Sequence, residues 1–230
     1  MKGTEVHQVL KQIRATHLHH ANSVATSCTF LEQRGLASRG FVEDHGLAQT
    51  PQNSDAIDRK FGIWHDVFVD HVDIHDRAGR RKGPNQYGPV LFVLDLDILL
   101  ALPKDSEVLV TKKNPVHWIR NEPDDARWFQ SAAELGNNIC FGDFDKMLVI
   151  RTPRGKLDFP DRRASVVLDD PGQCVSSGED AYAHAEKSLR EAAATSGMRL
   201  SLARRQCRYG CVCSEKYAAF GKKKIDFYFT

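Results

Sequence analysis

The sequence predicts a single α+β domain over residues 1–230, with mixed β-sheets and flanking helices. Apolar residues make up 41% and charged residues 27% of the chain, which is ordinary for a globular protein of this length. Strand-like and helix-like apolar patterns both occur along it, and no break in composition is strong enough to be a linker.

Strands are expected where short apolar runs occur. Residues 89–94 form the best of these, because five consecutive apolar residues are typical of a buried strand. The segment 67–74 alternates and is expected as a strand or the start of a helix. The other expected strands are 107–111, 147–152, 166–168 and, at the C-terminus, 225–229.

Helices are expected where a capping residue precedes a periodic segment. Ser23 is a plausible N-cap for a helix over 24–34, and Gly35 a plausible stop. The clearest helix is the alanine-rich segment 179–196, which Gly197 would end. A further helix is expected over 124–135, a short turn or helix over 95–102, and loops over 39–55 and 79–88.

Composition excludes several classes of protein. No apolar run approaches the ~20 residues needed to cross a bilayer, and the first residues contain no signal-peptide core, so we expect a soluble, cytoplasmic protein. Six dispersed or clustered cysteines do not make a disulfide framework. The chain also lacks the motifs of P-loop NTPases, dinucleotide-fold dehydrogenases, GxSxG hydrolases and HExxH proteases.

Positive charge gathers at the C-terminal end. Residues 199–230 contain eight Lys or Arg and two acidic residues, so they carry +6, and the rest carries −4 of the net +2. Such an end can be a docking patch for nucleic acid or an acidic partner, or simply a solvated edge. Tyr209, Tyr217 and Phe220 lie among these charges and could stack on bases, although aromatic residues at this spacing are more often core.

Three clusters carry candidate chemistry. The first, at residues 19–23, is His-His-Ala-Asn-Ser immediately before a helix, where imidazole and amide groups could orient a ribose or phosphate. The second, at residues 70–77, contains His71, Asp73 and His75, which on a strand would share one face and suit a divalent metal. Alternatively, Arg77 and the basic loop 80–82 could bind an anion, or the segment is a charged turn.

The third cluster is Cys207, Cys211 and Cys213. Thiolates this close could share a structural zinc, with Cys174 or a histidine such as His184 as the fourth ligand. The usual paired CxxC spacing is absent, so we favour three reduced thiols over a zinc site.

The segment from Leu18-His19-His20-Ala21-Asn22-Ser23 through a helix to Gly35-Leu36-Ala37-Ser38-Arg39 resembles the opening of the ADP-ribosyltransferase superfamily. It is most similar to DarT-type toxins, which modify nucleic acid. The resemblance spans roughly residues 17–170 and implies the split, mixed sheets of that fold. It also implies that NAD is the substrate and that no metal is needed.

The resemblance implies a role for individual residues. His20 would hold a ribose of NAD, with Asn22 beside it and Ser38 nearby. Tyr87 would line the nicotinamide pocket. Arg77, with Arg81 in reserve, would grip the NAD phosphate and support catalysis. These roles follow from motif position alone.

The catalytic acid implied by the resemblance is Asp145, at the start of an apolar strand. The family usually has glutamate there, and aspartate is one methylene shorter. Asp143 is the next choice, and Glu107 fits the local pattern but comes early in the chain. The resemblance also implies a DNA or RNA acceptor, and a toxin or phage-defence setting with a neutralising antitoxin or chaperone partner.

Three hypotheses of function follow. The first is NAD-dependent transfer of ADP-ribose to nucleic acid, with a protein acceptor as a variant. The second is a metal-dependent nuclease or phosphohydrolase that uses His71, Asp73, His75 and Asp76. The third is a non-catalytic module whose basic C-terminal region binds nucleic acid or an acidic partner.

Overall fold

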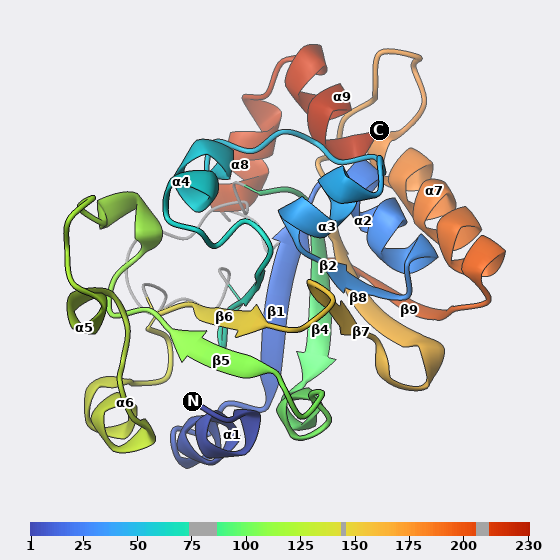
Figure 1. The fold of residues 1–230 in the computed structure, drawn as a ribbon. Helices are drawn as coiled ribbons and strands as arrows, with labels where there is room; N and C mark the ends of the chain where they lie inside the picture. The colour runs from blue at the N-terminus through green and yellow to red at the C-terminus, as the bar shows by residue number, and fades with distance from the viewer. Residues whose placement is uncertain (74–86, 144–145, 206–211) are drawn as a thin grey trace.

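A four-stranded sheet lies at the centre of the computed structural model, which describes residues 1–73, 87–143, 146–205 and 212–230 (Figure 1). The strand order is β1-β4-β8-β9, in which β8 and β9 are parallel and the other neighbours antiparallel. These strands are β1 (His17–Asn22), β4 (Val90–Asp95), β8 (Arg163–Asp169) and β9 (Arg199–Arg205).

Two smaller antiparallel sheets flank the central one. One pairs β2 with β7, and the other has the order β3-β6-β5. A bridge between His19 of β1 and Asp70, just beyond β3, joins the three-stranded sheet to the central sheet. The strands are β2 (Gly35–Ala37), β7 (Lys156–Asp158), β3 (Val67–Val69), β5 (Glu107–Val110) and β6 (Leu148–Arg151).

Helices surround the sheets, and α2 and α7 pack against each other beside the central sheet (Figure 1). No described helix has both the length and the apolar character needed to cross a bilayer. The α-helices are α1 (Gly3–Gln12), α2 (Val24–Glu32), α3 (Arg39–Asp44), α4 (Asp55–Lys60), α5 (Asp124–Arg127), α6 (Ala132–Asn138), α7 (Ala181–Ser196), α8 (Val212–Ala218) and α9 (Lys222–Phe229). The 3-10 turns are η2 (Leu96–Leu100), η3 (Pro115–His117) and η4 (Pro160–Arg162).

The cap residues explain where the two best-predicted helices begin and end. Ser23 caps α2 by accepting a hydrogen bond from the Thr26 amide, as its position predicts. Asp180 caps α7 through Ala183 N–H, and Gly197 ends it with φ +69°. The molecule is therefore a single α+β domain with three sheets and flanking helices, as the coarse sequence pattern predicts.

Most expected strands are confirmed, within one to three residues at their ends, as β4, β5, β6 and β8. The prediction that Gly35 ends α2 is wrong. Gln33 is the C-cap, Arg34 takes the left-handed conformation (φ +60°), and Gly35 begins β2. A Cβ on Gly35 would lie 2.5 Å from the Leu157 carbonyl oxygen, so the glycine allows close strand pairing rather than a helix stop.

Three other expectations are corrected. Residues 225–229 form part of helix α9 rather than a strand, because Ile225 and Phe229, four residues apart, are both fully buried on one helix face. The expected loop 39–55 contains α3. The expected helix 124–135 is split into α5 and α6, because Trp128 between them forms a β-bridge to Thr111.

Candidate functional site

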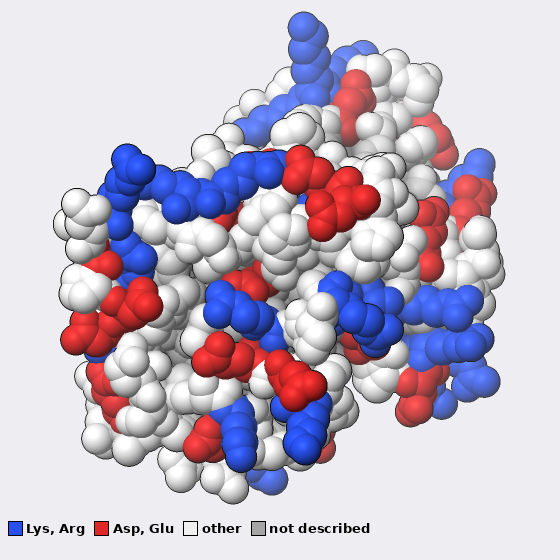
Figure 2. All heavy atoms as spheres, in the orientation of Figure 1, with Lys and Arg blue, Asp and Glu red and all other residues white. Residues whose placement is uncertain are grey.

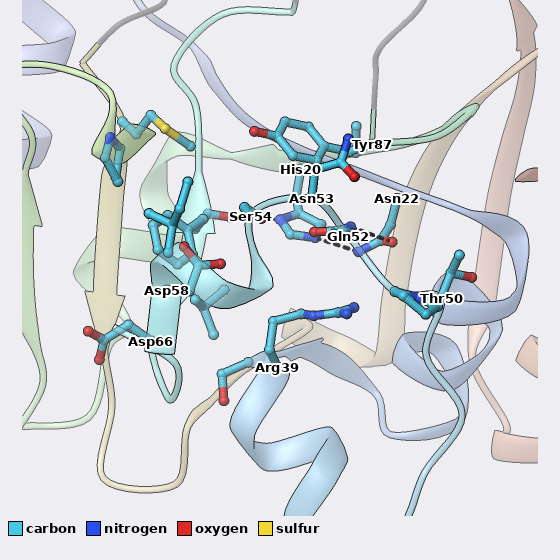
Figure 3. Close-up of a pocket in the computed structure, with 18 of the residues that line it drawn as sticks. His20, Asn22, Arg39, Thr50, Gln52, Asn53, Ser54, Asp58, Asp66 and Tyr87 are labelled. Carbon is cyan, nitrogen blue, oxygen red and sulfur yellow. Dashed lines mark hydrogen bonds between the residues drawn. The ribbon is translucent and has the colours of Figure 1, made fainter. Parts of the chain in front are cut away.

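The principal candidate site is a pocket of about 490 Å³ at the C-terminal end of β1, between the central sheet and the three-stranded sheet (Figure 3). Its size falls in the range that holds a drug-sized or nucleotide-sized ligand. Its polar wall contains His20, Asn22, Ser38, Arg39, Thr50, Gln52, Asn53, Ser54, Asp58, Asp66, Asp70, Tyr87, Asn114 and Lys224. Apolar side chains, among them Phe30, Ile57 and Met147, complete the lining.

His20 is held as a neutral imidazole in a defined tautomer. Its Nδ1 lies 2.7 Å from the Phe68 carbonyl oxygen, and because a carbonyl only accepts, Nδ1 carries the hydrogen. Nε2 is therefore an acceptor. Burial lowers the pKa of His20 from 6.5 to about 4, with a smaller lowering by the charge of Arg39 and a partial opposite effect from the Phe68 bond. An edge-on contact with Phe30 fixes the plane of the ring.

Asn22 extends this network to the segment before α4. Its Nδ2 lies 3.4 Å from His20 Nε2, while its Oδ1 accepts from Ser23 N–H at 3.0 Å and from Gln52 Nε2 at 3.1 Å. Figure 3 shows the three side chains in a row across the pocket. Since each polar atom has a defined role as donor or acceptor, the row is pre-organised.

Tyr87 lies above His20 in the same view (Figure 3). The next residue explains its position. Gly88 has φ +144°, and a Cβ there would lie 2.2 Å from the Asn22 carbonyl oxygen, so only glycine lets this chain segment pass against the end of β1. The close approach brings Tyr87 beside Asn22.

Ser38 and Arg39 enter the pocket from the start of α3. The Ser38 hydroxyl is engaged as the N-cap of that helix, 3.0 Å from Phe41 N–H. Arg39 is only 9% exposed, and its Nη2 donates to Asp55 Oδ2 at 2.7 Å. Its Nε and Nη1 are buried and have no acceptor among the described residues. Such buried, unpaired donors cost about 1–3 kcal/mol each.

Two buried carboxyl groups in the pocket have strongly raised pKa values. Burial raises the pKa of Asp58 to about 7, against the lowering effect of its bond to Ser54, while Asp55 adds to the rise and Arg39 opposes it. Burial alone raises the pKa of Asp70 to about 7. A third carboxyl group in the wall, Asp66, accepts hydrogen bonds from Arg151 on both oxygens, at 3.0 and 2.9 Å. Asp58 and Asp70 can thus each bind or release a proton near neutral pH.

The structure brings together four of the residues predicted to bind NAD: His20, Asn22, Ser38 and Tyr87 all line this pocket. The predicted catalytic residues Arg77 and Asp145 lie outside the described residues, as does the reserve Arg81.

The alternative acids do not line the pocket. Asp143 pairs with Lys146 in a turn. Glu107 lies at the start of β5, near the N-terminal amine and Arg151.

The sequence patterns gave no pocket role to Arg39, Gln52 or Asp58, and they placed Asp70 only in the charged cluster at residues 70–77. The segment containing Gln52 and Asp58 reads as a polar loop and helix start, and nothing in its pattern distinguishes a pocket wall from a solvated surface. The one local signal for Arg39 is its place at the first position of α3, two residues after the short apolar strand β2.

The metal-site hypothesis finds no support in the described part of the chain. His71 Nε2 donates to the Cys140 carbonyl oxygen at 3.3 Å, and Asp73 pairs with Arg205 at 2.8 Å. His75 and Asp76 lie outside the described residues. Over residues 1–73, 87–143, 146–205 and 212–230, no three His, Cys, Asp or Glu side chains are grouped to hold a metal ion.

The zinc hypothesis for the cysteine cluster concerns three side chains that the structure does not describe. Cys207 and Cys211 lie outside the described residues, and the side chain of Cys213 is not described. Of the two suggested fourth ligands, Cys174 is an exposed free thiol, and His184 is paired with Glu179 at 2.8 Å.

Part of the C-terminal basic charge is neutralised within the molecule. Arg204 pairs with Asp170, and Arg205 pairs with Asp169 and Asp73. Tyr217 is 3% exposed and donates to Asp169 at 2.7 Å, so it is a core residue and does not offer a free face for a base.

Four of the exposed lysines and arginines in this region lie on the last two helices. Lys216 of α8 and Lys222, Lys223 and Lys224 of α9 are exposed. Lys224 also lines the pocket, together with Phe227, which is 46% exposed. Figure 2 shows basic side chains over this end of the molecule, at the top of the view, and both signs of charge intermixed below.

Comparisons with known proteins do not assign a family. No family model matches the chain, and a search of curated proteins finds no match either.

Proposed function

We propose that this protein is an NAD-dependent mono-ADP-ribosyltransferase that modifies a nucleic acid, with the split-sheet fold of that superfamily. The observation that carries the proposal is the common location of His20, Asn22, Ser38 and Tyr87. The sequence resemblance assigns these four residues to NAD by motif position alone, and all four line one nucleotide-sized pocket.

The polarity of the pocket suits a dinucleotide. The unprotonated Nε2 of His20 can exchange its long 3.4 Å contact with Asn22 Nδ2 for a hydrogen bond from a ribose hydroxyl, and its low pKa keeps it an acceptor at neutral pH. The Tyr87 ring can stack on the nicotinamide. The amides of Asn22 and Gln52 are held to each other and are placed to contact the sugar.

In the proposed reaction, the bond between the ribose C1′ and the nicotinamide nitrogen breaks, and nicotinamide leaves as a neutral molecule with the bonding electrons. Positive charge develops on the ribose, and a carboxylate stabilises it. A nitrogen or oxygen of the acceptor base then bonds to C1′ and gives up its proton to a base in the site. Asp145 is the acid that the resemblance assigns. Asp58 and Asp70 can take up the proton in their ionised form, which becomes the main form above about pH 7.

The exposed α9 lysines favour a polyanionic acceptor. Lys222, Lys223 and Lys224 lead from the surface to the pocket rim, where Phe227 offers an exposed ring on which a base can stack. We also propose a neutralising partner, since the unrestrained reaction would damage the cell's own nucleic acid.

The test uses NAD labelled on the adenylate phosphate, incubated with separate pools of single-stranded DNA, RNA and protein. We expect label on nucleic acid only. His20→Ala should lower the rate by on the order of a hundredfold, because the ribose contact and the row of hydrogen bonds are lost. His17→Ala is the matched control, since His17 is exposed at the other end of β1. Intact NAD with every acceptor pool would refute the proposal.

A further inference from the structure

The buried guanidinium of Arg39 has hydrogen-bond donors that the protein does not use. Nη2 is paired with Asp55, but Nε, which carries one N–H, and Nη1, which carries two, have no acceptor among the described residues. The side chain is nine-tenths buried and extends into the pocket, below the row of His20, Asn22 and Gln52 (Figure 3).

Apart from Asp55, little negative charge in the pocket wall is free to pair with Arg39, since the carboxylate of Asp66 is held by Arg151. An arginine keeps its charge at any physiological pH. Asp55 Oδ2, its anionic partner, is shared with Gln52 N–H at 3.0 Å. Asp58 and Asp70 hold their protons up to about pH 7, and His20 is uncharged. Lys224 adds a second cation to the wall.

From this arrangement we infer that Arg39 is the phosphate-binding residue of the pocket and that it takes the pyrophosphate of a dinucleotide. A phosphate oxygen supplies the acceptor that the unused N–H groups lack, in a charge-assisted bond. The inference deepens the proposed function, on which it rests for the identity of the nucleotide. It gives Arg39, rather than Arg77 alone, a contact with the phosphates.

The position of Arg39 is fixed before any ligand arrives. Its guanidinium carbon lies 5.8 Å from the centre of the Trp64 ring, and Asp55 holds one end. The following residue is also tightly packed, because a Cβ on Gly40 would lie within 2.3 Å of the His65 ring. A rigid guanidinium loses little conformational freedom when it binds an anion.

Isothermal titration calorimetry with ADP-ribose, AMP and adenosine tests the inference without any turnover. The wild-type protein should bind ADP-ribose and AMP at least tenfold more tightly than adenosine. Arg39→Gln should weaken ADP-ribose binding by roughly ten- to a hundredfold, the range for a hydrogen bond to a charged group, and leave adenosine unchanged. The matched control is Arg59→Gln, which removes an exposed arginine that stacks on the same tryptophan.

A second variant separates binding from folding, because Arg39→Gln leaves Asp55 without its cation. The double variant Arg39→Gln/Asp55→Asn removes both charges together, and we expect it to melt close to wild type while still failing to prefer ADP-ribose over adenosine. If either variant folds and retains the wild-type preference for ADP-ribose, Arg39 does not bind phosphate.

The two proposals can fail separately. If NAD is never cleaved but ADP-ribose binding depends on Arg39, the phosphate site stands and the transferase proposal fails. If NAD is cleaved while Arg39→Gln binds ADP-ribose normally, the transferase proposal stands and the phosphate assignment is wrong.

Discussion

Replacing Asp58 by asparagine should change the pH dependence of the protein's stability. Asp58 is 7% exposed in the pocket wall, and burial raises the pKa of its carboxyl from 3.8 to about 7. Between these two pH values, the folded protein holds a proton that the unfolded chain has released. Stability therefore falls as pH rises through this range, because the folded state has the greater proton affinity.

The size of the effect follows from the shift. A pKa difference of one corresponds to about 1.36 kcal/mol, and the pKa of Asp58 rises by roughly three. This carboxyl should therefore make the free energy of unfolding about 4 kcal/mol lower above pH 7 than at pH 4. Asparagine does not titrate and can keep a hydrogen bond to Ser54. We therefore compare the free energy of unfolding of Asp58→Asn with that of wild type. The value for the variant minus the value for wild type should be about 4 kcal/mol higher at pH 8 than at pH 4.

Urea denaturation of both proteins at pH 4 and pH 8 measures this difference, since the other titrating groups cancel between variant and wild type. Asp105→Asn, at an exposed carboxyl outside the pocket, is the control for the loss of one surface charge. If the stability difference between Asp58→Asn and wild type is the same at both pH values, the carboxyl is ionised in the folded protein and the reasoning fails.

Three further predictions concern the pocket and its support. Gly88→Ala should destabilise the fold by about 3 kcal/mol or more in thermal melts, because its Cβ would lie 2.2 Å from the last carbonyl oxygen of β1, whereas Gly172→Ala, with open space around it, should cost only about 1 kcal/mol. Phe229→Ala should cost about 3–5 kcal/mol and Phe227→Ala well under 1, since the first side chain is fully buried and the second is 46% exposed; similar losses would contradict the helical assignment of α9. His20 should keep the nitrogen chemical shifts of the neutral Nδ1–H tautomer from pH 5 to 8, and an NMR titration midpoint near 6.5 would contradict its burial.

Helices and strands were predicted well where residues close together in the sequence carry the pattern. The apolar run of β4 and the alanine-rich α7 with Gly197 behind it both appear near their expected positions. The failures come from contacts made at a distance. Gly35 looks like a helix stop, yet glycine is needed there because a Cβ would lie 2.5 Å from the Leu157 carbonyl oxygen of β7. Residues 225–229 look like a strand because three aromatics lie close together, and only packing of Ile225 and Phe229 decides for the helix.

Some residues of the candidate site could also be predicted from a local motif, and others could not. The motif around His20 and Asn22 was visible in the sequence, because polar groups at the end of a strand and the start of a helix are close along the chain. Arg39, Asp58 and Asp70 come from α3, α4 and the residue after β3, and their importance arises from burial in the wall of one pocket, which no local pattern encodes.

The sequence by itself determined the α+β class, the N-cap of α2, the glycine that ends α7, and the choice of His20 and Asn22 as candidate ligands. These depend on contacts between residues a few positions apart. Only the tertiary structure decided which charges lose their solvent. The raised pKa of Asp58, the neutral state of His20 and the unused donors of Arg39 all result from burial, which depends on how distant segments pack together.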